Sequence, residues 1–205
     1  IRMGFSAMPN SNLQTGEINF IDSFSADTSV VGRVIDSLIS DLKRMKFVAE
    51  EISEIVIAMD EAVTNAVQET LCNNRICLEL RHDGAIRDIT VRYRVTDSEF
   101  DATIIDHGKG LDIKKMTAIT PDSASEGYHE QIFEYIDSRT EKKLHVTLNG
   151  KEVILNGIGA GLKIILSFMD QVKIDLIDKE SIVSSSVSDN TDGTIFNLKR
   201  RRRYL

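Results

Sequence analysis

The chain has 205 residues, of which 41% are hydrophobic, and its formal net charge is −7. This length supports one compact domain with a substantial core and leaves little sequence for a second domain. The acidic balance argues against nucleic acid as a direct partner, because nucleic-acid binding relies on clustered Lys and Arg.

The sequence indicates neither a disulfide-rich protein nor a membrane protein. Its two cysteines, Cys72 and Cys77, are too few for a disulfide framework, and its four histidines do not lie at zinc-ligand spacing around them. No segment approaches the ~18 apolar residues of a membrane span. We therefore expect a cytoplasmic protein without membrane association, whose residues 1–16 form a flexible N-terminus.

Two helices are expected in the first third of the chain. Weak alternation over residues 17–24 predicts an edge strand, and the apolar residues that follow recur at helical spacing until about Phe47. A second amphipathic helix is expected over residues 49–71, and residues 75–81 fit either a strand or more helix. The stripe opposite its apolar face consists of Glu54, Glu61, Asn65 and Gln68.

The remaining sequence is rich in strand signals. Strands are expected at residues 89–95, 100–105, 144–148, 152–155, 172–177, 182–187 and 194–198, and helices at 128–136 and 162–169. This order predicts a single domain over residues 1–205 with an α+β fold, a two-layer sandwich with helices on one face of a mixed, mainly antiparallel sheet. The basic run at residues 199–205 is expected to be a solvated tail.

Glu61 and Asn65 lie four residues apart in the second helix, so their side chains share one face of it. Taken alone, such a pair is typical of a solvated helix face. A functional interpretation is that the Asn65 amide oxygen ligates Mg²⁺, which prefers oxygen ligands and keeps several waters. The Glu61 carboxylate could then accept a proton from an attacking hydroxyl group.

Asp106, Gly108 and Gly110 follow a predicted strand in a D-x-G-x-G pattern. Taken alone, this pattern is usually a turn. A buried carboxylate at a strand end can also accept a hydrogen bond from an exocyclic amine such as adenine N6. The glycines then allow the backbone to approach a flat ring, because they carry no Cβ.

The glycine-rich residues 157–161 precede a helix that begins near Leu162. Amide groups at the positive N-terminus of a helix suit phosphate oxygens. A dinucleotide site of the Rossmann type is not indicated, because the Asn149-Gly150 hairpin before this segment is not the strand of a βαβ unit.

Together, these motifs resemble the GHKL ATPase superfamily, and most closely its anti-sigma-factor serine/threonine kinase branch (the SpoIIAB/RsbW-like family). The family's E-A-V-T-N-A box is similar to residues 61–66, and its D-x-G-x-G box to residues 106–110. Its G-x-G-L box resembles residues 159–162, and its terminal G-T-x-x-x-L strand resembles residues 193–198. The resemblance implies the Bergerat ATP-binding fold, with an enlarged ATP lid at residues 111–156.

The resemblance also implies a role for each matched residue. Glu61 would be the catalytic general base, and Asn65 would ligate Mg²⁺. Asp106 would bind the adenine amine with support from Thr194. The other nucleotide-binding positions would be Gly108 and Gly110 beside the base, and Gly157, Gly159, Gly161 and Leu162 around the phosphates.

Two departures from the family pattern bear on catalysis. A His often follows the box asparagine by four residues, whereas this chain has Glu69, which is expected to add negative charge near the magnesium side. The family often has Glu-Arg before its second glycine box, whereas this chain has Asn156-Gly157. No arginine is therefore assured for the γ-phosphate, and Lys163 is a candidate substitute.

The resemblance implies an ATP- and Mg²⁺-dependent serine/threonine protein kinase that acts as an anti-sigma factor in transcription regulation. Its partners would be a sigma factor and a STAS-domain antagonist that it phosphorylates, and it could form a homodimer. The alternative is a nucleotide-gated protein-binding switch with little or no kinase activity, which the Asn156-Gly157 substitution and the long lid favour. An autophosphorylating sensor kinase is not favoured, because this sequence has no long phosphoacceptor hairpin ahead of the ATP box.

Overall fold

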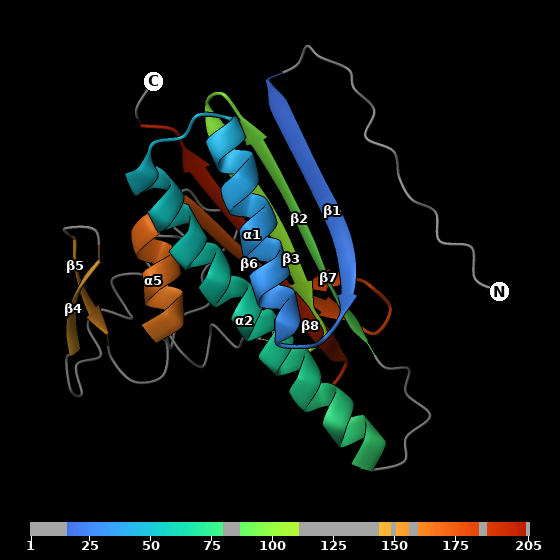
Figure 1. Ribbon diagram of the computed structural model, residues 1–205. Coiled ribbons are helices and arrows are strands. Elements are labelled where there is room, and N and C mark those ends of the chain that lie inside the picture. The colour runs from blue at the N-terminus through green and yellow to red at the C-terminus, as the bar shows by residue number, and fades with distance from the viewer. Residues whose placement is uncertain are drawn as a thin grey trace.

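The computed structural model describes residues 16–79, 87–110, 144–148, 151–155, 160–184 and 188–203. These residues form an α+β sandwich in which helices α1 (Ser29–Arg44), α2 (Ala49–Glu79) and α5 (Ala160–Phe168) cover one face of a six-stranded sheet (Figure 1). The two-layer fold predicted from the sequence is therefore confirmed. The described parts of the chain also contain a separate pair of strands, β4 (Leu144–Leu148) and β5 (Lys151–Leu155).

The six-stranded sheet has the order β1-β2-β3-β8-β6-β7, and each pairing described in it is antiparallel. Its strands are β1 (Glu17–Ser25), β2 (Asp88–Thr96), β3 (Glu99–Asp106), β6 (Gln171–Asp178), β7 (Val183–Ser184) and β8 (Thr191–Arg201). β1 lies at one edge, as predicted, and the short β7 lies at the other. β8 lies in the interior of the sheet, between β3 and β6.

The first helix, α1 (Ser29–Arg44), packs on the sheet through residues at helical spacing. Its buried side chains are Val30, Val34, Leu38 and Leu42. The helix ends before Phe47 because Lys46 has a left-handed backbone (φ 59°). The Phe47 N–H then donates to the Leu42 carbonyl (3.0 Å), which is the hydrogen bond of a Schellman C-terminus.

The second helix, α2 (Ala49–Glu79), extends beyond residue 71, in agreement with the helical alternative for residues 75–81. Asn73 and Asn74 do not end it, because both side chains have partners elsewhere. Asn73 Nδ2 donates to the His107 carbonyl (2.9 Å), and the Asn74 amide bonds with both the N–H and the carbonyl of Arg87 (3.1 Å each). None of the helices in the described ranges is both long and apolar enough to span a membrane.

The basic residues near the C-terminus do not form the solvated tail that the sequence predicts. β8 continues through Arg201, and Arg200 is 1% exposed. Its guanidinium binds the carboxylate of Glu54 and the carbonyl of Phe168. Glu54 is equally buried, although its position in the helix is on the stripe opposite the apolar face. β8 pairing orients Arg200 toward the helices, where Glu54 compensates its charge.

The hairpin expected around Asn149-Gly150 is present as β4 (Leu144–Leu148) paired with β5 (Lys151–Leu155). The helix expected at residues 128–136 falls outside the described residues. The strand expected at residues 182–187 is described at Val183–Ser184, and residues 185–187 also fall outside the described part.

Candidate functional site

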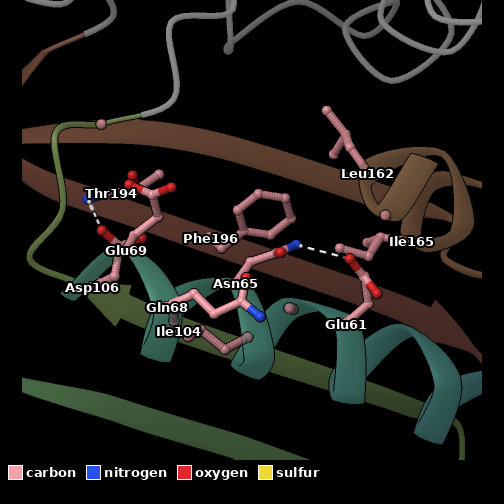
Figure 2. Close-up of a pocket in the computed structure, with 14 residues that line it drawn as sticks. Glu61, Asn65, Gln68, Glu69, Ile104, Asp106, Leu162, Ile165, Thr194 and Phe196 are labelled. Carbon is pink, nitrogen blue, oxygen red and sulfur yellow. Dashed lines mark hydrogen bonds between the residues drawn. The ribbon is translucent and has the colours of Figure 1, made fainter. Parts of the chain in front are cut away.

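A cavity of about 250 Å³ lies between α2, α5 (Ala160–Phe168) and the adjoining ends of β3 and β8 (Figure 2). Seven of the residues singled out in the sequence line it: Glu61, Asn65, Asp106, Gly110, Gly161, Leu162 and Thr194. The other lining residues are Ala62, Ala66, Gln68, Glu69, Ile104, Ile165 and Phe196. Motifs from four separate parts of the sequence thus meet at one cavity.

The remaining predicted site residues are not in this lining. Gly108 is adjacent to it, because its N–H donates to Asp106, which lines the cavity. Gly157 and Gly159 fall outside the described residues. Lys163 is 3% exposed and does not line the cavity, so its position does not fit the suggested role of reaching a phosphate there.

Asp106 is the last residue of β3 and is 9% exposed. Its Oδ1 atom accepts hydrogen bonds from the N–H groups of Gly108 (2.9 Å) and Thr194 (3.2 Å). The second bond is possible because the sheet register pairs Asp106 with Thr194. The turn and the neighbouring strand therefore fix the orientation of this carboxyl group.

Burial raises the pKa of Asp106 to about 6, and the nearby carboxylate of Glu69 contributes to the rise. Hydrogen bonds from Gly108 and Thr194 act in the opposite direction, because they stabilise the ionised form. Asp106 is consequently a carboxylate at neutral pH and gains a proton in mildly acidic solution. As a carboxylate it can accept a hydrogen bond from a donor in the cavity.

Glu61 and Asn65 lie on the cavity side of α2, toward the opposite end from Asp106 (Figure 2). Asn65 Nδ2 donates to Glu61 Oε1 over 3.2 Å, which leaves the amide oxygen of Asn65 as the atom that could ligate a cation. Gly161, in the first turn of α5, allows this carboxylate to lie close to the helix. A Cβ at Gly161 would be 1.8 Å from Glu61 Oε1.

Within the described ranges, no three His, Cys, Asp or Glu side chains are grouped so that they could hold a metal ion. The donor set at Asn65 nevertheless fits Mg²⁺, which commonly binds proteins through one or two oxygen ligands and completes its shell with waters and substrate phosphates. The site therefore fits a cation that is bound together with a phosphate ligand.

The apolar residues that line the cavity were not predicted from the sequence, although their positions follow from its periodicity. Ile104 precedes Asp106 by two residues and Phe196 follows Thr194 by two, so each shares a sheet face with its polar neighbour. Ile165 is one turn beyond Gly161 on α5. Extending each motif by one strand or helix period would have identified these residues.

The loop that follows Asp106 is attached to both layers. The His107 N–H donates to Thr70 Oγ1 (3.0 Å), and His107 Nδ1 lies 3.2 Å from the Asp192 carbonyl oxygen. Arg87 forms a salt bridge with Asp192 (3.1 Å). Gly193 lies against the other side of the loop, where a Cβ would be 2.0 Å from the Asp106 carbonyl oxygen.

We predict that Gly193→Ala destabilises the protein by about 1–3 kcal/mol, because the added methyl group meets backbone that cannot move without disrupting the β3–β8 pairing. Urea unfolding followed by far-ultraviolet circular dichroism measures this change. Gly32→Ala is the matched control, because Gly32 lies in α1 with nothing within 4 Å of its added Cβ. A Gly193→Ala variant as stable as the wild type would contradict this description of the loop.

Comparison with known proteins shows what this chain is similar to. No protein-family model matches the chain. Over 110 residues the chain is 31% identical to the serine-protein kinase RsbW of Bacillus pumilus (strain SAFR-032). The chain is thus similar to a protein of the RsbW type, the branch that its sequence motifs resemble. The match covers 50% of this chain and 63% of that RsbW, so the chain spans just under two thirds of its relative's length.

The helix-on-sheet sandwich of this RsbW-like chain is consistent with the GHKL ATPase fold. One of its two departures from the family pattern lies inside the site, because Glu69 lines the cavity. Glu69 lies beside Asp106 and not on the magnesium side where its charge was expected (Figure 2). The other, Asn156-Gly157, falls outside the described residues.

Proposed function

We propose that this RsbW-like chain binds ATP with Mg²⁺ in the cavity and transfers the γ-phosphoryl group to a serine or threonine of a partner protein. The proposal is supported mainly by the set of residues that line one cavity. A buried acceptor, Asp106, lies at one end, and the Glu61–Asn65 pair lies beside the first turn of α5 at the other (Figure 2). The identity to a serine-protein kinase supports the same activity.

The end of the cavity at Asp106 suits the base. Its carboxylate would accept a hydrogen bond from the adenine N6 amine, while Gly108 and Thr194 hold it in place. The apolar side chains of Ile104 and Phe196 would contact the faces of the ring. Gly110 has φ +79°, and a Cβ there would lie 2.7 Å from Thr191, so this part of the cavity wall requires a glycine.

The end at α5 suits the phosphates. The first turn of α5 leaves backbone N–H groups without partners inside the helix, and these groups and the helix dipole favour anions. Asn65 would hold Mg²⁺ through its amide oxygen. When bound, Mg²⁺ would neutralise part of the phosphate charge and favour departure of ADP.

Glu61 would act as the general base. The oxygen of the partner's hydroxyl group would form a bond to the γ-phosphorus as the bond from that phosphorus to the ADP oxygen breaks. Glu61 would take the hydroxyl proton, and its hydrogen bond to Asn65 would keep it on the phosphate side of the cavity.

By resemblance, the proposed partners are a sigma factor and a STAS-domain antagonist that carries the accepting Ser or Thr. The direct test is incubation with Mg·ATP labelled at the γ-phosphate, alone and with STAS-domain proteins encoded beside this chain. We expect label on a Ser or Thr of one such protein. No transfer to any of them, with ATP bound, would overturn the kinase assignment.

A nucleotide-gated switch with little turnover is a second candidate. It is favoured by the contacts of Glu61, whose carboxylate is already engaged by Asn65 and packed on Gly161. In that case ATP should change the affinity for a partner protein without label transfer. Pull-down of candidate partners with ATP, ADP and no nucleotide separates the two functions.

We predict that ATP affinity falls about tenfold between pH 7.5 and pH 5. The pKa of Asp106 is raised to about 6, so the carboxylate is the main form above that pH and only about a tenth remains one unit below it. Protonation removes the acceptor for the amine, so affinity is lost as pH falls. Calorimetric titration with Mg·ATP measures this change.

Asp106→Asn is the control for the pH series. We expect it to bind ATP roughly 10- to 100-fold more weakly than the wild type at pH 7.5 and to lack the Asp106-dependent decline. Equal ATP affinity in the wild type and Asp106→Asn would contradict the placement of the base at Asp106.

A further inference from the structure

The carboxylates that line the cavity are not evenly distributed. Glu61 lies at the α5 end, whereas Glu69 and Asp106 lie together at the other end, beside Thr194 (Figure 2). Glu69 follows Asn65 by four residues and is therefore one turn further along the same face of α2. Its side chain is exposed, in contrast to that of Asp106.

Glu69 and Asp106 both lie close to Gly108. A Cβ built on Gly108 would lie 2.7 Å from Glu69 Cβ, 3.2 Å from Glu69 Oε2 and 3.3 Å from Asp106 Oδ1. The carboxylates of Glu69 and Asp106 thus border the same small space. The wider surroundings contain other titratable or charged groups, namely His107 and Lys109 on the same loop and Asp192 paired with Arg87.

A single carboxylate does not by itself choose between purines. It can accept from the N6 amine of adenine, but also from the adjacent N1–H and N2 amine of guanine. The two bases differ in what lies beside those donors. Adenine presents a second N6 hydrogen, whereas guanine presents the O6 acceptor, which a second carboxylate repels.

We propose that Glu69 is a specificity-determining residue that excludes guanine nucleotides from the site. This proposal rests on the proposed ATP-binding function. Asp106 binds the amine, and Glu69 adds a second negative group at the same edge of the base. An adenine edge offers two hydrogens to this pair. A guanine edge places its O6 oxygen against one of the two carboxylates, and the repulsion between them weakens guanine binding.

The test is calorimetric titration of the wild type, Glu69→Gln and Glu69→Ala with Mg·ATP and Mg·GTP. The amide has the size of the acid without its charge, and the alanine keeps the Cβ that contacts Gly108. We expect both variants to lower the ATP-to-GTP affinity ratio by roughly 3- to 30-fold, mainly through tighter GTP binding. Glu50→Gln is the matched control, an exposed acid in the first turn of the same helix.

A second measurement distinguishes a direct role from a structural one. Glu69 contributes to the raised pKa of Asp106, so Glu69→Gln should move the midpoint of the acid loss of ATP affinity to lower pH, while Glu50→Gln should not. An unchanged ATP-to-GTP ratio in a variant that still binds ATP would overturn this proposal and leave the proposed function standing. Failure of the wild type to bind ATP would overturn both.

Discussion

Glu61→Gln is expected to slow phosphoryl transfer by roughly 10²–10⁴ while ATP affinity changes by no more than about threefold. The amide has the shape of the carboxylate, and its oxygen can still accept the hydrogen bond from Asn65 Nδ2. It has no useful basicity, so the hydroxyl proton has no acceptor when the new bond to phosphorus forms. Single-turnover transfer of labelled phosphate to the partner protein measures the rate, and calorimetry measures the affinity.

Asp60→Asn is the matched control for this experiment. Asp60 precedes Glu61, is exposed and does not line the cavity, so removing its charge should leave the transfer rate unchanged. Equal rates for the wild type and Glu61→Gln would show that Glu61 is not the base. If both rates are negligible with each candidate partner, the nucleotide-gated switch becomes the better description.

Arg200→Met is expected to lower the free energy of unfolding by about 3–5 kcal/mol. Both Arg200 and Glu54 are 1% exposed, so loss of the guanidinium leaves a carboxylate buried without its ionic partner. The carbonyl of Phe168, at the end of α5, loses a donor in the same variant. The chain has no Trp, so urea unfolding is best followed by far-ultraviolet circular dichroism.

The double variant Glu54→Leu with Arg200→Met tests whether the loss comes from the unpaired charge. Replacement of a buried ion pair by apolar residues is often close to neutral, so we expect the second substitution to restore most of the lost stability. Arg201→Met is the control, because Arg201 is the next residue of β8 and is exposed. Similar effects of Arg200→Met and Arg201→Met would contradict the role of the buried pair.

The sequence predicted the elements whose signals are local. Alternation in β2 and β3 and helical spacing in α1 each reflect a single face packed against the core, so periodicity alone identifies them. The extent of α2 was not predictable in this way. Asn73 and Asn74 resemble stop signals until their side chains are known to bond with residues that the fold brings close.

The same distinction separates the predicted and missed parts of the site. Glu61, Asn65, Asp106 and Thr194 carry polar chemistry in recognisable patterns, and all four line one cavity. The contact between Glu69 and Gly108 joins a helix to a loop far along the chain, and no spacing in the sequence reports it. The burial of Arg200 was not predicted for a related reason. Five consecutive basic residues indicate a solvated segment, and only the fold shows that one of them pairs with a buried carboxylate.

The interior position of β8 determines when, during synthesis of the chain, the cavity is completed. Thr194 and Phe196 line the cavity from an interior strand, and the Thr194–Asp106 hydrogen bond joins residues that are 88 positions apart. When the ribosome has released only β1 to β3 and the first two helices, β8 is not yet available to pair with β3. The cavity then lacks the wall that β8 provides. If the proposed function is right, nucleotide should bind only after the ribosome has released β8, because the cavity is incomplete until then.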